Sequence, residues 1–101
     1  MEKDLRYTEL YELYKELLTE RQREIFSCHY CLDLSLSEIA EPDGNTRQSV
    51  YAIIKTVKSK LDEYEKVLGL YEKNQKLAII SNSVKDYDED LAQQILEIVG
   101  K

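Results

Sequence analysis

A basic stretch without any acidic residue runs from position 45 to position 61 of this chain. It holds Arg47, Lys55, Lys58 and Lys60, whereas the remaining residues carry ten basic and twenty acidic side chains. Cations gathered on one element can bind the phosphates of a nucleic acid, and their local charge matters more for this than the net charge of −6. The same four cations would also suit the solvated face of an ordinary helix, so charge alone does not decide between these interpretations.

Polar side chains suited to reading nucleic-acid bases lie at the start of this stretch. The candidates for base contacts are Thr46, Arg47, Gln48, Ser49 and Tyr51. Arg47 can bind guanine or a phosphate, and Gln48 can pair with adenine. Lys55 and Lys58 follow further along the same predicted helix, where they would suit backbone phosphates. We therefore predict a nucleic-acid site here and leave open whether the ligand is DNA or RNA.

The other residues that could do chemistry are Cys28, His29 and Cys31. A closed zinc site needs four ligands, and the chain has two cysteines and one histidine in all. A thioredoxin-like pair belongs in a strand–helix context that the sequence lacks, so Cys28 is better read as a small apolar residue of a helix. No phosphate loop or Ser-His-Asp arrangement appears either. We expect no metal, no cofactor and no enzymatic activity.

The composition predicts one all-α domain spanning residues 1–101. Three glycines and one proline leave few breaks in the chain, and a chain of this length usually forms one domain. No apolar stretch approaches the length of a membrane span. The first residues, Met1 to Asp4, lack the basic-then-apolar order of a signal peptide. We expect a cytoplasmic protein with no membrane association.

Two helices are predicted before the basic stretch, at residues 4–18 and 20–32. Apolar residues recur in the first with helical spacing. Thr19 and Gln22 have the spacing of a capping box that starts the second. The positions expected to face the core are Tyr7, Leu10, Tyr11, Tyr14, Leu17 and Leu18 in the first helix, and Ile25, Phe26, Cys28 and Leu32 in the second.

A helix-turn-helix is predicted within residues 19–61. Ser35 starts a short supporting helix, which Pro42 ends at the preceding residue. Gly44 suits a tight turn, and Thr46 can cap the long helix that follows. In such modules the early residues of the second helix reach base edges in the major groove.

The long helix continues beyond what base recognition requires. Its apolar residues repeat every 3.5 positions, which is typical of a helix–helix seam: Val50, Ile54, Val57, Leu61, Tyr64, Leu68 and Tyr71. We predict a homodimer with an interface of Leu61, Tyr64, Leu68 and Tyr71. The alternative is that the first helix and residues 91–99 cover this seam within one chain.

Residues 62–101 are predicted to form a helical extension of the module. Gly69 can weaken or end the long helix, and a further helix is predicted at about residues 71–80. A loop at residues 81–83 and a last helix at residues 88–99 complete the chain. The acids of the last helix lie in its first turn, where they favour the helix dipole.

The segments "LLTERQREIFSCHY" and "SLSEIAEPDGNTRQSVYAIIK" resemble region four of bacterial sigma factors. Together with "LDEYEKVLGLYEK", they are more similar to the YlxM family of small bacterial proteins, closely over residues 7–73 and by shape only over 74–101. The resemblance implies a winged-helix-like fold without the wing and a regulatory role. The usual gene neighbourhood of the family implies a connection to the signal recognition particle, through its RNA or its Ffh GTPase.

The turn departs from the family pattern E-E-F-G-V-S. Asp43 and Asn45 replace apolar residues that would plug the turn into the core. We expect weaker local packing and a negative charge near any bound phosphate. Two functions therefore stand side by side: a nucleic-acid-binding regulator, and a protein-interaction module that binds a component of the particle without touching nucleic acid.

Overall fold

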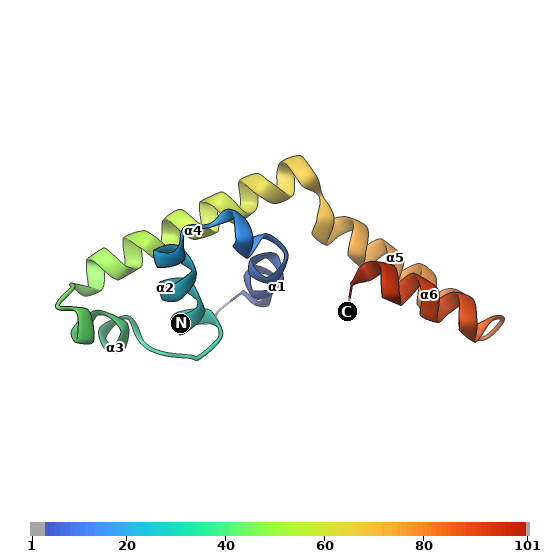
Figure 1. The fold of residues 1–101 in the computed structure, drawn as a ribbon, viewed down its shortest axis with the longest axis horizontal. Helices are drawn as coiled ribbons and strands as arrows, with labels where there is room; N and C mark the ends of the chain where they lie inside the picture. Colours follow the sequence, from blue (N-terminus) through green and yellow to red (C-terminus); the bar gives the residue numbers. More distant parts are fainter. Residues whose placement is uncertain (1–3, 101) are drawn as a thin grey trace. The chain divides into compact units, whose positions relative to one another are not determined.

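The computed structural model describes residues 4–100 and divides the chain into two compact units, one ending at Leu68 and the other beginning at Gly69. Every regular element in the described range is a helix, and no strand occurs there. This confirms the predicted all-α class. The chain predicted as one domain is thus built from two helical units, each described below by itself (Figure 1).

The first helix, α1 (Leu5–Tyr14), is shorter than predicted. Asp4 caps it, because its carboxylate accepts a hydrogen bond from the backbone N–H of Arg6. A 3₁₀ turn, η1 (Lys15–Leu17), then tightens the chain and changes the direction in which side chains point. As a result Leu17 is exposed, although helical spacing predicted it in the core.

The second helix, α2 (Glu20–Tyr30), starts with the predicted capping box. The N–H of Gln22 donates to Thr19 Oγ1 over 3.2 Å, and the N–H of Thr19 donates back to Gln22 Oε1 over 3.0 Å. The helix ends at Tyr30, two residues before the predicted end. Leu32 therefore lies beyond the helix and is 66% exposed, which corrects its prediction as a core residue.

The supporting helix, α3 (Leu36–Ala40), and the turn after it also follow the predicted signals. Ser35 and Glu38 form a second capping box. A 3₁₀ turn, η2 (Glu41–Asp43), contains Pro42 and ends at Gly44, which adopts a left-handed φ of 68°. Glycine accepts this conformation without the steric cost that other residues carry.

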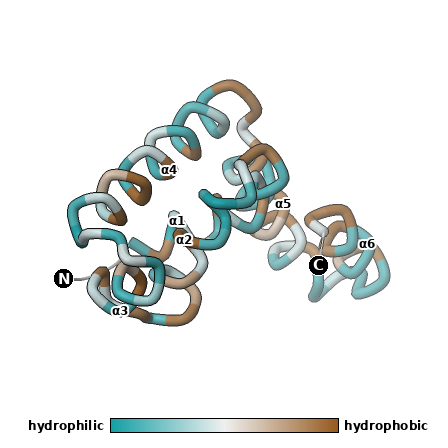
Figure 2. The backbone as a smooth tube through the Cα atoms, turned by 60° about the vertical axis from the view of Figure 1, so that its left-hand side comes forward, coloured by the Kyte–Doolittle hydropathy of each residue, from teal (hydrophilic) through white to brown (hydrophobic). Residues whose placement is uncertain are grey.

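The long helix, α4 (Arg47–Leu68), lies across α1, α2 and α3 in the first unit (Figure 1). Hydrophilic and hydrophobic residues alternate along its length, as the teal and brown segments of Figure 2 show. The core of the unit lies between these four helices. Its buried apolar residues are Leu10, Tyr11, Tyr14, Leu18, Ile25, Phe26, Tyr30, Ile39, Ala40, Val50, Ile54, Val57 and Leu61.

The predicted seam ends where the first unit ends. Gly69 follows α4 with a left-handed φ of 62°, so the helix stops at Leu68. Tyr71 consequently lies on the next helix, so the apolar repeat from Val50 to Tyr71 is not carried by a single helix. Its first four members are buried in the core of the first unit.

The second unit is a helical hairpin of α5 (Leu70–Val84) and α6 (Glu89–Val99), which lie side by side (Figure 1). The prediction of a loop at residues 81–83 is wrong, because α5 includes these residues. The hydroxyl of Ser81 is buried and donates to the carbonyl oxygen of Ala92 on α6 over 2.8 Å. The hydroxyl of Ser83 donates to the carbonyl of Ile79 one turn back. Both serines are therefore satisfied within the hairpin instead of favouring a loop.

No helix within residues 4–100 is long and apolar enough to cross a membrane.

Candidate nucleic-acid interface

Four of the predicted site residues lie together on one exposed side of α4, which we call the open face: Arg47, Gln48, Tyr51 and Lys55. Residues three and four positions apart on a helix are neighbours on its surface, which is the spacing that this set follows. None of the four side chains forms a hydrogen bond or ion pair with another residue in the described part of the chain. The open face therefore offers two cations, an amide and an aromatic ring to a ligand.

Thr46 and Ser49 lie outside this face. The hydroxyl oxygen of Thr46 accepts a hydrogen bond from the N–H of Ser49 over 3.1 Å and caps α4. Ser49 follows Arg47 by two positions, which places it about 200° around the helix axis. Thr46 thus holds the start of the helix, and Ser49 points away from the open face.

Lys58 is engaged within the first unit. It is half-buried, and its ammonium nitrogen lies 5.2 Å from the centroid of the Tyr7 ring and 5.7 Å from that of Tyr30. A cation at these distances is attracted by the electron-rich faces of aromatic rings. The structure therefore assigns Lys58 to packing between helices, although its spacing predicted a phosphate contact.

The sequence did not identify Leu36, which completes the site. Leu36 is the first residue of α3, and it lines a shallow hollow with Arg47, Gln48 and Tyr51 of α4. The hollow therefore joins both helices of the helix-turn-helix. Its only sequence signal was an apolar residue at the start of the supporting helix, which core packing would equally explain.

The polar turn is closed by an ion pair and by backbone hydrogen bonds. Asp43 Oδ2 lies 2.9 Å from Nη1 of Arg21 on α2. The N–H groups of Gly44 and Asn45 donate to the carbonyls of Glu41 and Ala40. Asp43 thus makes a contact where the family pattern has an apolar plug, and its negative charge is partly offset by Arg21. An exposed pair of this kind stabilises a fold by at most about 1 kcal/mol.

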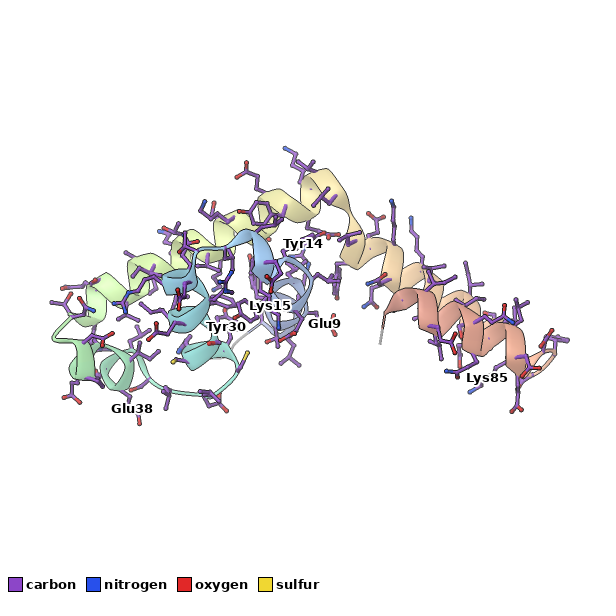
Figure 3. All side chains as sticks on the ribbon, viewed as in Figure 1. Glu9, Tyr14, Lys15, Tyr30, Glu38 and Lys85 are labelled. Carbon is purple, nitrogen blue, oxygen red and sulfur yellow. The ribbon has the colours of Figure 1, made fainter. Side chains whose placement is uncertain are left out.

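The supporting helix and turn present acids and no cations. Residues 35–46 hold Glu38, Glu41 and Asp43 without any lysine or arginine, and all three carboxylates are exposed. The pKa of Glu38 is lowered by hydrogen bonds from the backbone N–H and the side chain of Ser35. Glu38, labelled on α3 in Figure 3, is therefore ionised at neutral pH. This acidic segment borders the cations of the open face.

The cysteine and histidine residues are spread over differently exposed positions. Cys28 is half-buried and Cys31 is exposed, and neither forms a disulfide. His29 Nδ1 lies 2.8 Å from the carbonyl oxygen of Leu34, which it reaches as a donor. Within the described chain no three histidine, cysteine or carboxylate residues gather closely enough to hold a metal.

The residues predicted at a dimer interface fall in different environments. Leu61 is fully buried in the first unit, which corrects its assignment to an interface. The Tyr64 hydroxyl donates to the carbonyl of Leu17 over 3.2 Å, so this residue is partly used within the chain. Leu68 is 46% exposed, and Tyr71 is half-buried on α5.

The fold and the open face define a helix-turn-helix protein. The chain belongs to the UPF0122 family, whose model matches residues 1–99 and is described as "Putative helix-turn-helix protein, YlxM / p13 like". This confirms the family resemblance. A UPF0122 protein of Geobacillus sp. (strain WCH70) is 45% identical over 87 residues, covering 86% of this chain and 79% of the relative. The UPF0122 protein of Geobacillus kaustophilus is 37% identical, covering 97% of this chain and 96% of the relative. That of Clostridium kluyveri is 40% identical, covering 90% of this chain and 82% of the relative.

Proposed function

We propose that this chain is a cytoplasmic, non-catalytic regulator that binds nucleic acid through the open face of α4. The observation that carries the proposal is that Arg47 and Lys55 are exposed cations without a partner among the described residues, and that Gln48 and Tyr51 lie between them on the same helix. In helix-turn-helix proteins this part of the second helix contacts the nucleic acid. Membership of a helix-turn-helix family supports the same conclusion.

Binding through this face has a defined electrostatic signature. Each phosphate that a cation neutralises releases condensed counterions, so affinity falls as salt rises. If each of the two cations of the open face contacts one phosphate, a plot of log affinity against log salt concentration should have a slope of about −2, and a somewhat shallower slope for a single strand. A purely apolar interaction would show little of this dependence.

The experiment is a titration of fluorescein-labelled DNA and RNA by anisotropy at several salt concentrations. The Arg47→Ala/Lys55→Ala double variant should bind more weakly and show a flatter salt dependence. The matched control is Lys66→Ala/Lys73→Ala, which removes the same charge from exposed positions elsewhere. If both double variants lose affinity equally, net charge and not the open face governs binding, and the proposal is wrong.

We propose further that the regulated system is the signal recognition particle. The support is the family resemblance, which implies this connection through gene neighbourhood. The ligand of the open face would then be the RNA of the particle. Capture of the particle RNA by the tagged protein, and its loss with Arg47→Ala/Lys55→Ala, is the expected result; recovery of the Ffh GTPase without RNA would instead favour the protein-interaction module.

A second candidate function, protein interaction through a homodimer, is favoured by the apolar surface of the hairpin. Ile79, Leu91, Leu96 and Ile98 are all substantially exposed, and the buried residues of this unit are Ser81 and Ala92. A hairpin of about this size seldom has enough core to be stable alone, so cover from a second chain would stabilise it. Sedimentation equilibrium at several concentrations tests this: a mass near 11.9 kDa throughout would refute the dimer.

A further inference from the structure

Tyr51 lies at the centre of the open face with a cation on either side. Arg47 precedes it by four residues and Lys55 follows it by four, so the three side chains share one side of α4, one turn apart. The Tyr51 side chain is 49% exposed, and its hydroxyl has no hydrogen-bond partner among the described residues. An exposed ring between two cations matches the way in which proteins hold single-stranded nucleic acid, with bases stacked on the ring and phosphates on the cations.

The hollow beside Tyr51 has the chemistry of a base-binding pocket. Leu36 supplies apolar surface and Tyr51 an aromatic ring, both of which can pack against a planar base. The Gln48 amide carries both a donor and an acceptor, as needed to pair with the edge of a base. Arg47 adds donors only, which suit a base carbonyl or a phosphate oxygen.

The charge of the supporting helix opposes the usual docking on a duplex. In that geometry the first helix of the module crosses the phosphate backbone. Here this helix and its turn carry no cation of their own. Asp43 is paired with Arg21 of α2, whereas Glu38 and Glu41 form no ion pair among the described residues, so a second strand would meet their carboxylates. A single strand that follows Arg47, Tyr51 and Lys55 along α4 can keep its phosphates on the two cations and meet α3 only through the apolar side chain of Leu36.

We infer that the open face holds an unpaired nucleotide, with its base in the hollow between Leu36 and Tyr51, and not the groove of a continuous duplex. This inference rests on the proposed function and specifies its ligand. Unpaired nucleotides occur in bulges and loops of folded RNA and in single-stranded DNA, and both present the same base and phosphate chemistry. The 2′-hydroxyl is the group that separates them, so the test includes both sugars.

The experiment compares a blunt duplex with the same duplex carrying one bulged 2-aminopurine, each prepared as RNA and as DNA. Fluorescence anisotropy gives the affinity, and 2-aminopurine fluorescence reports whether the base stacks on an aromatic ring. The parent protein should bind the bulged ligand about ten-fold more tightly than the duplex and quench its fluorescence. Tyr51→Leu should remove both effects, whereas Tyr51→Phe keeps the ring and should retain them.

Tyr87→Leu is the matched control, because this tyrosine is 90% exposed and lies in the turn of the hairpin. It should leave both signals unchanged. If blunt and bulged ligands bind equally and Tyr51→Leu weakens them alike, the unpaired-base inference is wrong while nucleic-acid binding stands. If neither ligand binds even at low salt, the proposed function itself fails and the inference falls with it. A preference for bulged RNA over bulged DNA would identify the natural sugar.

Discussion

The ammonium nitrogen of Lys58 lies 5.2 Å from the centroid of the Tyr7 ring, and this contact ties α4 to α1. The same ammonium lies 5.7 Å from the ring of Tyr30 on α2, which meets the Tyr7 ring edge to face with the two centroids 6.4 Å apart. Next to it, the hydroxyl of Tyr7 donates to Asp62 of α4 over 2.7 Å. The Tyr7 side chain thus contacts the long helix twice, through its ring and through its hydroxyl. Helix packing here therefore depends on polar groups as well as on the apolar core.

Replacing Lys58 with alanine should destabilise the protein more than it affects binding. Cation–ring contacts at partly exposed sites are worth about 0.5–1 kcal/mol, and Lys58 faces two rings. We expect the free energy of unfolding in urea to fall by about 1 kcal/mol. Lys55→Ala, at an exposed position of the same helix, is the control and should stay within about 0.5 kcal/mol of the parent. A Lys58→Ala variant that keeps full stability but loses nucleic-acid affinity would show that Lys58 contacts phosphate after all.

The hydrogen bond between Tyr7 and Asp62 should make stability depend on alkaline pH. This hydrogen bond, together with desolvation, raises the pKa of Tyr7 from 10.0 to about 12. Because the folded-state value is the higher one, the stabilisation is fully present below pH 10 and is lost as the pH rises towards 12. The side chain is only half-buried, so screening by solvent limits the effect to about 1 kcal/mol or less.

The measurement for this pH dependence is urea unfolding of the parent and Tyr7→Phe between pH 9 and about pH 12. The difference between the two proteins cancels the titration of the other seven tyrosines. It should be largest near pH 9 and shrink as the pH rises. A difference that stays constant over this range would mean that the hydroxyl does not stabilise the fold through Asp62.

Much of the fold could be predicted from short local signals. The capping boxes at Thr19 and Ser35 and the glycine turn at Gly44 each act through backbone groups within a few residues, so the sequence alone identifies them. The helical position of Ser81 cannot be predicted in this way, for the opposite reason. Its hydroxyl partner is the carbonyl of Ala92, eleven residues away on another helix, and no local pattern reveals such a contact.

The candidate site could be predicted as a set of residues but not as a surface. Arg47, Gln48, Tyr51 and Lys55 were found because helical spacing alone places them on one side of α4. Lys58 has nearly the same spacing, yet tertiary packing draws it towards Tyr7 and Tyr30. Leu36 was missed because its role depends on how α3 packs against α4.

The Ser81 hydroxyl should be a measurable support of the hairpin. Ser81→Ala removes the buried hydrogen bond to the Ala92 carbonyl, and we expect unfolding to become easier by about 1 kcal/mol. Ser83→Ala is the control, because its hydroxyl is exposed and bonds only within its own helix. Amide hydrogen exchange of α6 resolves the effect locally. Equal exchange rates in the two variants would exclude a special role for Ser81.

The ion pair between Arg21 and Asp43 should contribute little by itself. Both side chains are more than 40% exposed, so a double-mutant cycle with Arg21→Ala and Asp43→Ala should give a coupling energy below about 1 kcal/mol. Chemical denaturation of the four proteins supplies this value. Restoring the apolar residue of the family pattern with Asp43→Phe should cost no more than the pair contributes. A coupling energy well above this range would mean that the ion pair, and not the backbone hydrogen bonds of Gly44 and Asn45, holds the turn.

Leu68 is the residue of the predicted interface that remains available to a second chain. It lies at the end of α4 and is 46% exposed, beside the more exposed Val67. If the protein is a homodimer with Leu68 in its interface, Leu68→Asp would bury a carboxylate without a partner, which costs several kcal/mol unless the charge reaches water. The variant should sediment as a monomer at concentrations where the parent is a dimer. Gln75→Asp makes the same charge change at an exposed position of α5 and should leave the dimer intact. If Leu68→Asp stays dimeric, the interface lies elsewhere, and the exposed Ile98 of α6 becomes the next position to substitute.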